Sequence, residues 1–560
     1  RRATPLTAAG LAWLAGFAMF LAGTWWWVAL GREFAGLGPV AAVALAALFA
    51  GYQALPYGLA AASTAFLGQR YQLPPLLVGP LCLGLAEALL PFFFKTSLAI
   101  VLWQVRPLAQ TAELGGPPAV AALLVLVNLT LGSLLVSLLE RRSLPPASRR
   151  AAVLCLALTA LGWGRAWQVE QRRLQAPRLS CGIVQPNFGV VAAQERRLHN
   201  ERFIAALRAA TQELGRRGVD LILWPESAWP LLFDRTLTRE FAAGHPWELR
   251  PGVRGRLLLG ALTHQFGGTT VCNSALLFAD DRRLAGRYDK TRLVPFAEAI
   301  PLASRFPDWA KRLRTRLPDW PAITPGPALT LLQDGDVAIG AMICAEDLDS
   351  LLAQRLARLR PNLLVSLASD AWFGASSAPV QHLALASFRA IETRRDLVRA
   401  TNTGVSAIID ATGRKQLTGP LLAVPRNQPA PPTLLQGEVR LLNIPSCGRH
   451  GVRFFPLAAA LILGALLASR ILGLGRGALE HRQRSLWMGG PQPHILQSGL
   501  GAGQIPEQSQ DVWQPFAKIL GNDVPGDQEK RTDENLALEV LIRPAGQVDK
   551  RGPPRRPARW

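Results

Sequence analysis

Paired cysteines and clustered histidines are missing from this 560-residue sequence. Its six cysteines contain no CxxC pair, and its seven histidines show neither HxxxH nor CxxC…H spacing. Disulfide frameworks and zinc sites depend on such spacings, so neither is predicted. We expect no metal and no cofactor.

Charged residues are also scarce. They make up 18% of the chain against 49% hydrophobic residues, and the mean hydropathy is +0.17. Such a composition is more apolar than that of an ordinary soluble protein and predicts a membrane protein. The net charge of +22 comes with no stripe of aromatic residues among the basic ones. This pattern favours anionic lipid head groups over nucleic acid as the partner.

Six apolar runs are candidates for membrane spans, since about 20 residues of helix cross about 30 Å of hydrocarbon. They are residues 3–31, 35–69, 71–94, 114–139, 151–164 and 454–474. The third run contains Glu87, and the fifth reaches full length only if Arg165 snorkels. Five spans therefore precede a central region, and one follows it.

Arginine-rich loops indicate the orientation of these spans. Four arginines lie in residues 141–150, and four more close or follow the last span, at 470, 476, 482 and 484. The positive-inside bias places these segments in the cytoplasm and the central region outside it, in the periplasm of a bacterium. Lys95 and Arg106 are exceptions in an outer loop. The alternative is that the arginines are merely solvated loop residues.

The central region, residues 175–445, has the alternating pattern of strand-like and helix-like segments that is typical of an α/β domain. Short β-branched or Leu-rich runs such as DVAIGAMIC and NLLVSLASD alternate with helix-like stretches. Residues 1–174 are the predicted helices before this domain, and residues 446–475 contain the last span. Residues 476–560 are rich in Pro, Gly, Gln and charge without a period, which predicts a disordered tail.

Three polar residues in this domain fit one chemistry. Glu226 ends the run VDLILWPE, Cys344 ends VAIGAMIC, and Lys290 follows the strand-like LLFAD in GRYDKTRLVPFAE. A thiol attacks an acyl carbon as thiolate, which requires a base, and the developing oxyanion requires a fixed cation. Glu226, Lys290 and Cys344 would supply base, cation and nucleophile.

Two alternatives stay open at this point. A lone cysteine in an apolar run is commonly an inert core thiol. His382 is the nearest candidate for a Cys-His dyad, although it lies within a stretch of helical period. The acidic run after Cys344 predicts a helix whose N-terminal dipole points at the thiolate.

Several segments together resemble the nitrilase superfamily, and specifically the apolipoprotein N-acyltransferases. They are WPES at 224–227, YDKTRLVPFAE at 288–298, ICAED at 343–347, SDAWFG at 369–374 and RATNTG at 399–404. The resemblance spans roughly residues 6 to 475. It implies a transmembrane helical bundle plus an extramembrane αββα sandwich, an α+β membrane protein.

The resemblance also implies roles for individual residues. Glu226 would be the general base, Lys290 the oxyanion stabiliser and Cys344 the acylated nucleophile. Further residues would support the site or line the acyl channel: Glu298 and Glu346 as supporting acids, Trp372 and Phe373 as substrate-binding aromatics.

The implied activity is transfer of a fatty acyl chain from a membrane phospholipid, through a cysteine thioester, to the α-amine of a diacylglyceryl-cysteine lipoprotein. The implied location is the bacterial inner membrane, with the enzyme a monomer and its catalytic domain periplasmic. The alternatives are a membrane-tethered amidase of small amides and a degenerate, non-catalytic membrane protein.

Two departures from the family pattern stand out. The family commonly has an aromatic residue directly after the nucleophile, where this chain has Ala345. The family also has seven spans before the catalytic domain, against five predicted here. We therefore expect the chain to lack two N-terminal helices of the family.

Overall fold

The computed structural model describes most of the chain up to Trp487. The described residues are 3–33, 36–92, 94–189, 193–265, 267–268, 270–300, 303, 305–316, 323–374, 376–422 and 430–487. The predicted tail falls largely outside them.

A bundle of helices precedes the sheets. Its elements are α1 (Pro5–Gly23), α2 (Trp26–Glu33), α3 (Pro39–Gln53), α4 (Leu55–Tyr71), α5 (Pro75–Leu89), η1 (Leu98–Leu102), α6 (Arg106–Ala109), α7 (Ala112–Leu139) and α8 (Pro146–Leu174). The last helix, α13 (Gly448–Trp487), packs against α7 and α5 and completes the helix bundle. It continues past residue 475, where the sequence predicts the last span to end.

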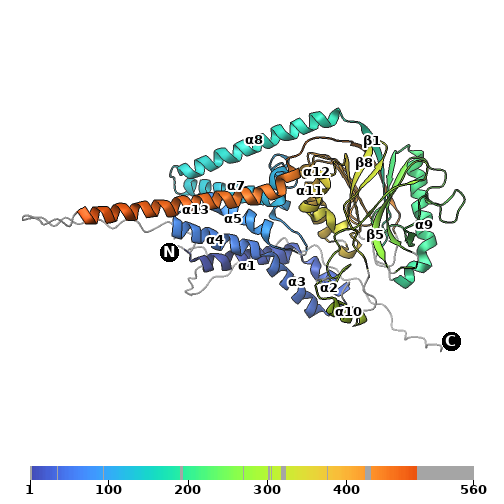
Figure 1. Cartoon of the computed structure of the whole chain (residues 1–560), viewed down its shortest axis with the longest axis horizontal. Helices are drawn as coiled ribbons and strands as arrows, with labels where there is room; N and C mark the ends of the chain where they lie inside the picture. Colours follow the sequence, from blue (N-terminus) through green and yellow to red (C-terminus); the bar gives the residue numbers. More distant parts are fainter. Residues whose placement is uncertain are drawn as a thin grey trace, which may run out of the picture. The chain divides into compact units, whose positions relative to one another are not determined.

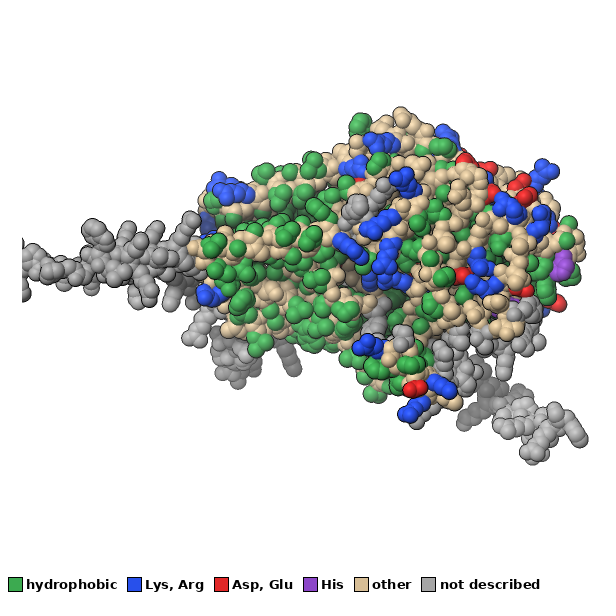
Figure 2. Space-filling model, viewed as in Figure 1, with side chains coloured by type: hydrophobic (Ala, Val, Ile, Leu, Met, Phe, Trp, Pro, Cys, Tyr) green, Lys and Arg blue, Asp and Glu red, His purple; other side chains and the backbone are tan. Residues whose placement is uncertain are grey.

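Five described helical segments are long and apolar enough to cross a membrane, and α5 is a shorter apolar helix beside them. The first predicted span is interrupted: α1 ends at Gly23, and Thr24 turns the chain into the separate α2. The fifth predicted span is too short, since α8 runs on through Arg165 to Leu174. Hydrophobic side chains cover much of the visible bundle surface, and charged ones gather over the sheets (Figure 2).

A domain of two mixed sheets lies between α8 and α13, and we call it the sheet domain. Its elements are β1 (Arg178–Gln185), α9 (Ala193–Arg216), β2 (Leu221–Leu223), β3 (Phe233–Asp234), β4 (Arg256–His264), β5 (Val271–Phe278), β6 (Leu284–Asp289), α10 (Pro307–Arg316), β7 (Leu331–Asp334), β8 (Val337–Ile343), η2 (Cys344–Leu348), α11 (Ser350–Arg358), β9 (Leu363–Ala368), η3 (Ala371–Phe373), α12 (Ala378–Thr393), β10 (Leu397–Thr401), β11 (Ala407–Ile409), β12 (Lys415–Thr418) and β13 (Thr433–Arg440).

The two sheets stack face to face between helices (Figure 1). One has the order β13-β1-β2-β4-β5-β6, with β3 beside β4, and the other has the order β12-β11-β10-β9-β8-β7. Side chains such as Ile183 and Ile339 form the core between the sheets. Leu207 of α9 packs on the outer face of the first sheet, and Leu356 of α11 on that of the second. This αββα sandwich beside an apolar bundle confirms the predicted fold class.

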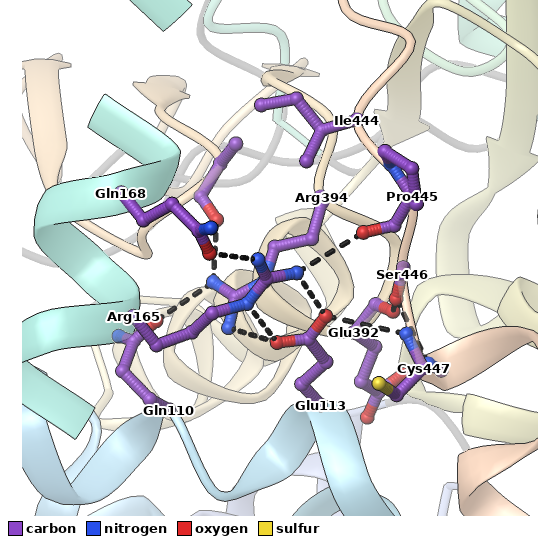
Figure 3. Close-up of polar contacts among 12 residues, drawn as sticks. Gln110, Glu113, Arg165, Gln168, Glu392, Arg394, Ile444, Pro445, Ser446 and Cys447 are labelled. Atoms are coloured by element: carbon purple, nitrogen blue, oxygen red, sulfur yellow. Dashed lines mark hydrogen bonds and ion pairs between the residues drawn. The ribbon is translucent and has the colours of Figure 1, made fainter. Parts of the chain in front are cut away.

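A buried charge cluster joins the helix bundle to the sheet domain, and Figure 3 shows its members converging. Glu113 of α7 accepts hydrogen bonds from Arg165 of α8 at 2.7 and 2.9 Å, and from Arg394 after α12 at 2.6 Å. Arg165 also donates to the Pro445 carbonyl before α13, and the Cys447 backbone N–H donates to Glu113. We call these contacts the Glu113 clamp. Arg165 is thus paired internally, and it does not snorkel.

The two basic residues that did not fit the arginine pattern also contact the sheet domain. Lys95 Nζ lies 2.8 Å from Asp349 Oδ1, and Arg106 donates to Thr412 Oγ1 at 3.2 Å. The segment between α5 and α7 therefore lies on the sheet-domain side of the bundle. Because these two cations make contacts within the protein, they do not count against the orientation that the arginine-rich loops indicate.

Candidate active site

Glu226 lies just beyond β2, where the chain turns away from the first sheet. Gly260 of the neighbouring β4 makes this turn possible, because a Cβ added there would lie 2.6 Å from the Glu226 Cα. The Glu226 side chain is 9% exposed. Its Oε1 accepts a hydrogen bond from Asn273 Nδ2 at 2.8 Å and one from Lys290 Nζ at 3.3 Å.

Lys290 directly follows β6 and is 1% exposed. Its ammonium contacts two carboxylates, Glu226 and, at 2.9 Å, Glu298 Oε1. Glu298 is held in turn by the Val294 backbone N–H at 2.9 Å. Burial alone would lower the pKa of Lys290, but the charges of Glu226, Cys344 and Glu298 raise it above its usual value. Lys290 is therefore a fixed cation.

Cys344 stands at the turn from β8 into the short helix η2, in a left-handed backbone conformation with φ of 53°. The residue as a whole is partly buried at this turn, at the C-terminal end of β8. Such a conformation costs a non-glycine residue roughly 1–3 kcal/mol and is concentrated at functional sites. An inert core thiol would gain nothing from it.

The electrostatic setting of Cys344 keeps its thiol protonated at rest. Burial and the charge of Glu226 raise its pKa well above the usual value, and Lys290 opposes this shift only in part. Nucleophilic attack would therefore require a base to take the proton, and Glu226 is the carboxylate whose charge acts most strongly on the thiol. The expected helix dipole is wrong, because η2 is a single short 3₁₀ helix and α11 starts only at Ser350, with Asp349 as its N-cap.

Glu346 holds together the loops that carry the candidate site. It is 1% exposed and accepts hydrogen bonds from the backbone N–H groups of Thr291, Arg292 and Ile343, at 2.9 to 3.0 Å. The Tyr288 hydroxyl donates to it as well. Glu346 thereby ties the segment after Lys290 to the strand end before Cys344.

His382 is committed elsewhere, which removes the Cys-His alternative. Its Nε2 and Nδ1 lie 2.8 Å from Asp347 Oδ1 and Asp370 Oδ1. Arg399 pairs with both aspartates. Burial lowers the pKa of His382, but the two carboxylates raise it to about 9. A charged imidazolium with both nitrogens occupied does not serve as a base for Cys344.

Phe373 meets the helix bundle, and Trp372 is 42% exposed beside it. The Phe373 ring lies 5.0 Å from Trp26 and 6.3 Å from Phe94, centroid to centroid. Next to these rings is a cavity of about 820 Å³. Its lining includes Trp25, Trp26 and Arg32 of the bundle together with Ser376 and Ser377 of the sheet domain.

Sequence reasoning missed Asn273, which bridges the two carboxylates. Its Nδ2 donates to Glu226 at 2.8 Å and to Glu298 at 3.3 Å, and its carbonyl accepts from the Lys290 N–H. The available signal was a single asparagine opening the otherwise apolar run NSALLFAD. Of the other predicted site residues, Glu298 contacts Lys290, Phe373 contacts Trp26 at the edge of the cavity, and Glu346 contacts the loops around Lys290 and Cys344.

Comparisons with known proteins identify the family of this chain. Residues 182–418 match the family of carbon-nitrogen hydrolases, and residues 1–130 match the apolipoprotein N-acyltransferase N-terminal domain. An apolipoprotein N-acyltransferase of Pseudomonas putida is 31% identical over 492 residues, which is 84% of this chain and 90% of that protein. One of Geobacter metallireducens is 29% identical over 405 residues, 69% of this chain and 71% of that protein.

The sheet domain is thus that of an acyltransferase of the carbon-nitrogen hydrolase, or nitrilase, class, carried on a multi-pass membrane bundle. Within that class the chain belongs to the apolipoprotein N-acyltransferase family.

Proposed function

We propose that Cys344 carries a fatty acyl group from a membrane phospholipid to the N-terminal amine of a diacylglyceryl-cysteine lipoprotein. The observation that carries this proposal is the contact of Lys290 with both Glu226 and Glu298 beside the strained Cys344 turn. Base, cation and nucleophile are then present in one place, on a domain joined to apolar helices. Both lipid substrates would reach such a site from the bilayer.

In the first half-reaction Glu226 takes the proton of the Cys344 thiol as the sulfur attacks an ester carbonyl carbon of the phospholipid. The Lys290 ammonium stabilises the negative oxygen that develops on that carbon. The ester C–O bond then breaks, and Glu226 returns the proton to the leaving oxygen. The products are a lysophospholipid and a thioester on Cys344.

In the second half-reaction the α-amine of the lipoprotein attacks the thioester carbonyl carbon. Glu226 takes a proton from the amine, the C–S bond breaks, and the proton passes to the Cys344 sulfur. An amide is formed and the free thiol is restored. The acyl group is thus transferred twice, first to the enzyme and then to the acceptor, which is a ping-pong mechanism.

The approach for the lipids is the cavity beside Trp25 and Trp26. The apolar rings that line it would accompany acyl chains. The catalytic face is assigned to the periplasm and the bundle to the inner membrane of a bacterium. The support is the arginine-rich loop at 141–150, at the ends of α7 and α8 remote from the sheet domain.

The activity is tested with purified protein, a phospholipid with labelled acyl chains and a synthetic diacylglyceryl-cysteine lipopeptide. We expect labelled amide on the lipopeptide from the wild type, none from Cys344→Ala, and a loss of roughly 10²- to 10⁴-fold for Glu226→Gln. Release of ammonia from small amides without any lipopeptide product would instead support an amidase.

A further inference from the structure

Two cations from different parts of the protein meet at one carboxylate beside the site. Lys95 Nζ, from the segment after α5, lies 2.8 Å from Asp349 Oδ1. Arg292 Nη1, from the loop after Lys290, lies 2.7 Å from Asp349 Oδ2. Asp349 is buried, with a side chain 6% exposed, but the Lys95 and Arg292 side chains are 43% and 45% exposed. The cations are accessible, while their shared partner is not.

The charges of this cluster are unbalanced. Two cations on one carboxylate leave a net charge of +1, and most of the N–H donors of both cations remain available for a ligand. A phosphodiester carries one negative charge and offers oxygens to both a lysine and an arginine. Bound against Lys95 and Arg292, it would bring the cluster to neutrality.

The cluster is joined to the nucleophile by a short stretch of chain. Asp349 follows Cys344 by five residues, directly after η2. The Arg292 backbone is fixed by Glu346, which also holds Ile343 before the nucleophile. In a glycerophospholipid, five or six bonds join the phosphorus to an ester carbonyl carbon, roughly 6–8 Å at ordinary bond lengths. A phosphate bound at the cluster would therefore leave the ester carbonyl carbon only a short span away, on the side of the chain that leads back to Cys344.

The approach to the cluster is apolar on one side. Phe94, the residue before Lys95, faces the rings of Trp26 and Phe373 at centroid distances of 5.9 and 6.3 Å. A lipid whose phosphate rests on Lys95 would have its acyl chains beside these rings. Such an order of charge and apolar surface fits a phospholipid and does not fit a small water-soluble amide.

We propose that Lys95 and Arg292 bind the phosphodiester of the phospholipid donor and so place its ester carbonyl at Cys344. This assignment rests on the function proposed above and adds to it the group by which the donor is recognised. Asp349 acts as a positioning residue, because it holds the two cations together but competes with the phosphate for them.

The test compares two donors with the same acyl chains, a phosphatidylglycerol and the uncharged diacylglycerol, in detergent micelles. The specificity constant for acylation of Cys344 is measured with each donor. Variants are compared by the ratio of the constant for the phospholipid to the constant for the diacylglycerol. We expect Lys95→Met and Arg292→Gln each to lower this ratio about tenfold or more, the effect of losing one charge-assisted hydrogen bond. Arg216→Gln, an exposed arginine on α9, is the matched control.

Asp349→Asn separates ligand binding from a structural salt bridge. Asparagine still caps α11, since it is as good an N-cap as aspartate, and both cations lose their competitor. The ratio should then rise or stay equal to that of the wild type. If Asp349→Asn lowers it as the cation variants do, the cluster is structural and the proposal is wrong.

Equal specificity constants for the two donors in the wild type would also overturn the phosphate site, while leaving the acyl-enzyme intact. No acylation of Cys344 from either donor would instead contradict the proposed function itself. The two failures are therefore distinguishable in one set of measurements.

Discussion

Gly260 shows how a residue without a side chain shapes the candidate site. The Pro225–Glu226 backbone passes so close to β4 that a Cβ at position 260 would lie 2.6 Å from the Glu226 Cα and 2.9 Å from the Ser227 N. Both contacts involve backbone, which has no rotamer to yield. Any larger residue therefore has to move Glu226 away from Lys290.

We expect Gly260→Ala to lower the rate of Cys344 acylation by about 10²-fold, since displacement of a catalytic group by about 1 Å costs that much. Gly268→Ala is the matched control, because a Cβ there meets only ordinary contacts, with the nearest at 3.5 Å. The rates are measured with the labelled phospholipid. Equal rates for the two variants would show that β4 does not position Glu226.

At this scale the sequence indicated candidates whose surroundings are local. Glu226 and Cys344 were proposed because each ends a strand-like run, and Lys290 because it follows one, and each fits a chemical role that the reaction requires. Asn273 and the pairing of His382 were not, because both depend on which strands and helices become neighbours. The partners of His382, Asp347 and Asp370, are 35 and 12 residues away along the chain.

Among the elements, α7 links the bundle to the sheet domain through the Glu113 clamp. Glu113 is 3% exposed and Arg394 is fully buried, so the contact has no solvent to replace a lost partner. Removal of one member of such a pair leaves an uncompensated buried charge, which costs roughly 3–5 kcal/mol. The clamp therefore stabilises the protein only while both the carboxylate of Glu113 and the arginines that pair with it are present.

Glu113→Gln is expected to destabilise the protein by about 3 kcal/mol and to separate the unfolding of the sheet domain from that of the bundle. The control is Glu213→Gln on α9, which breaks exposed pairs and costs under about 1 kcal/mol. Unfolding in detergent is followed by thermal melting. A shift for Glu113→Gln no larger than that for Glu213→Gln would contradict the role of the clamp.

Element boundaries were less predictable than element types. The runs of apolar residues indicated where helices lie, but α1 ends at Gly23 while the apolar run continues to residue 31. Hydropathy does not register the turn at Thr24, whose backbone N–H and hydroxyl both bond to the Phe20 carbonyl. In α8 the helix instead continues beyond the apolar run, which ends at residue 164. The helix can do so because Arg165 is neutralised by Glu113, a residue 52 positions away.

For the whole molecule, the order of the helices separates the sheet domain from the arginine-rich loop. α7 leaves the Glu113 clamp, and α8 returns to the sheet domain at Leu174, so the loop between them lies at the remote ends of both helices. By the positive-inside bias, we propose that this remote end is cytoplasmic. The α/β character of the domain was predictable from alternating patterns, and its sandwich of two sheets from the family resemblance, whereas the packing of the domain against the bundle was not.

A reporter that is active only in the periplasm tests this orientation. Fused after Arg250 it should be active, and fused after Pro145, at the start of α8, it should be silent. A reporter active only in the cytoplasm should give the inverse pattern at the same two positions. Periplasmic activity after Pro145 would reverse the assigned face of the sheet domain.

The central claim is that Cys344 is acylated by phospholipid without any acceptor, and intact-protein mass spectrometry tests it most directly. Phospholipid alone should add one fatty acyl mass to the wild type, on Cys344, through a bond that neutral hydroxylamine cleaves as it does thioesters. Cys344→Ala should gain nothing, and a Lys290→Met variant should acylate roughly 10²- to 10³-fold more slowly. If the wild type gains no mass from any phospholipid while Cys344 stays open to alkylating reagents, the proposed acyl-transfer chemistry is wrong.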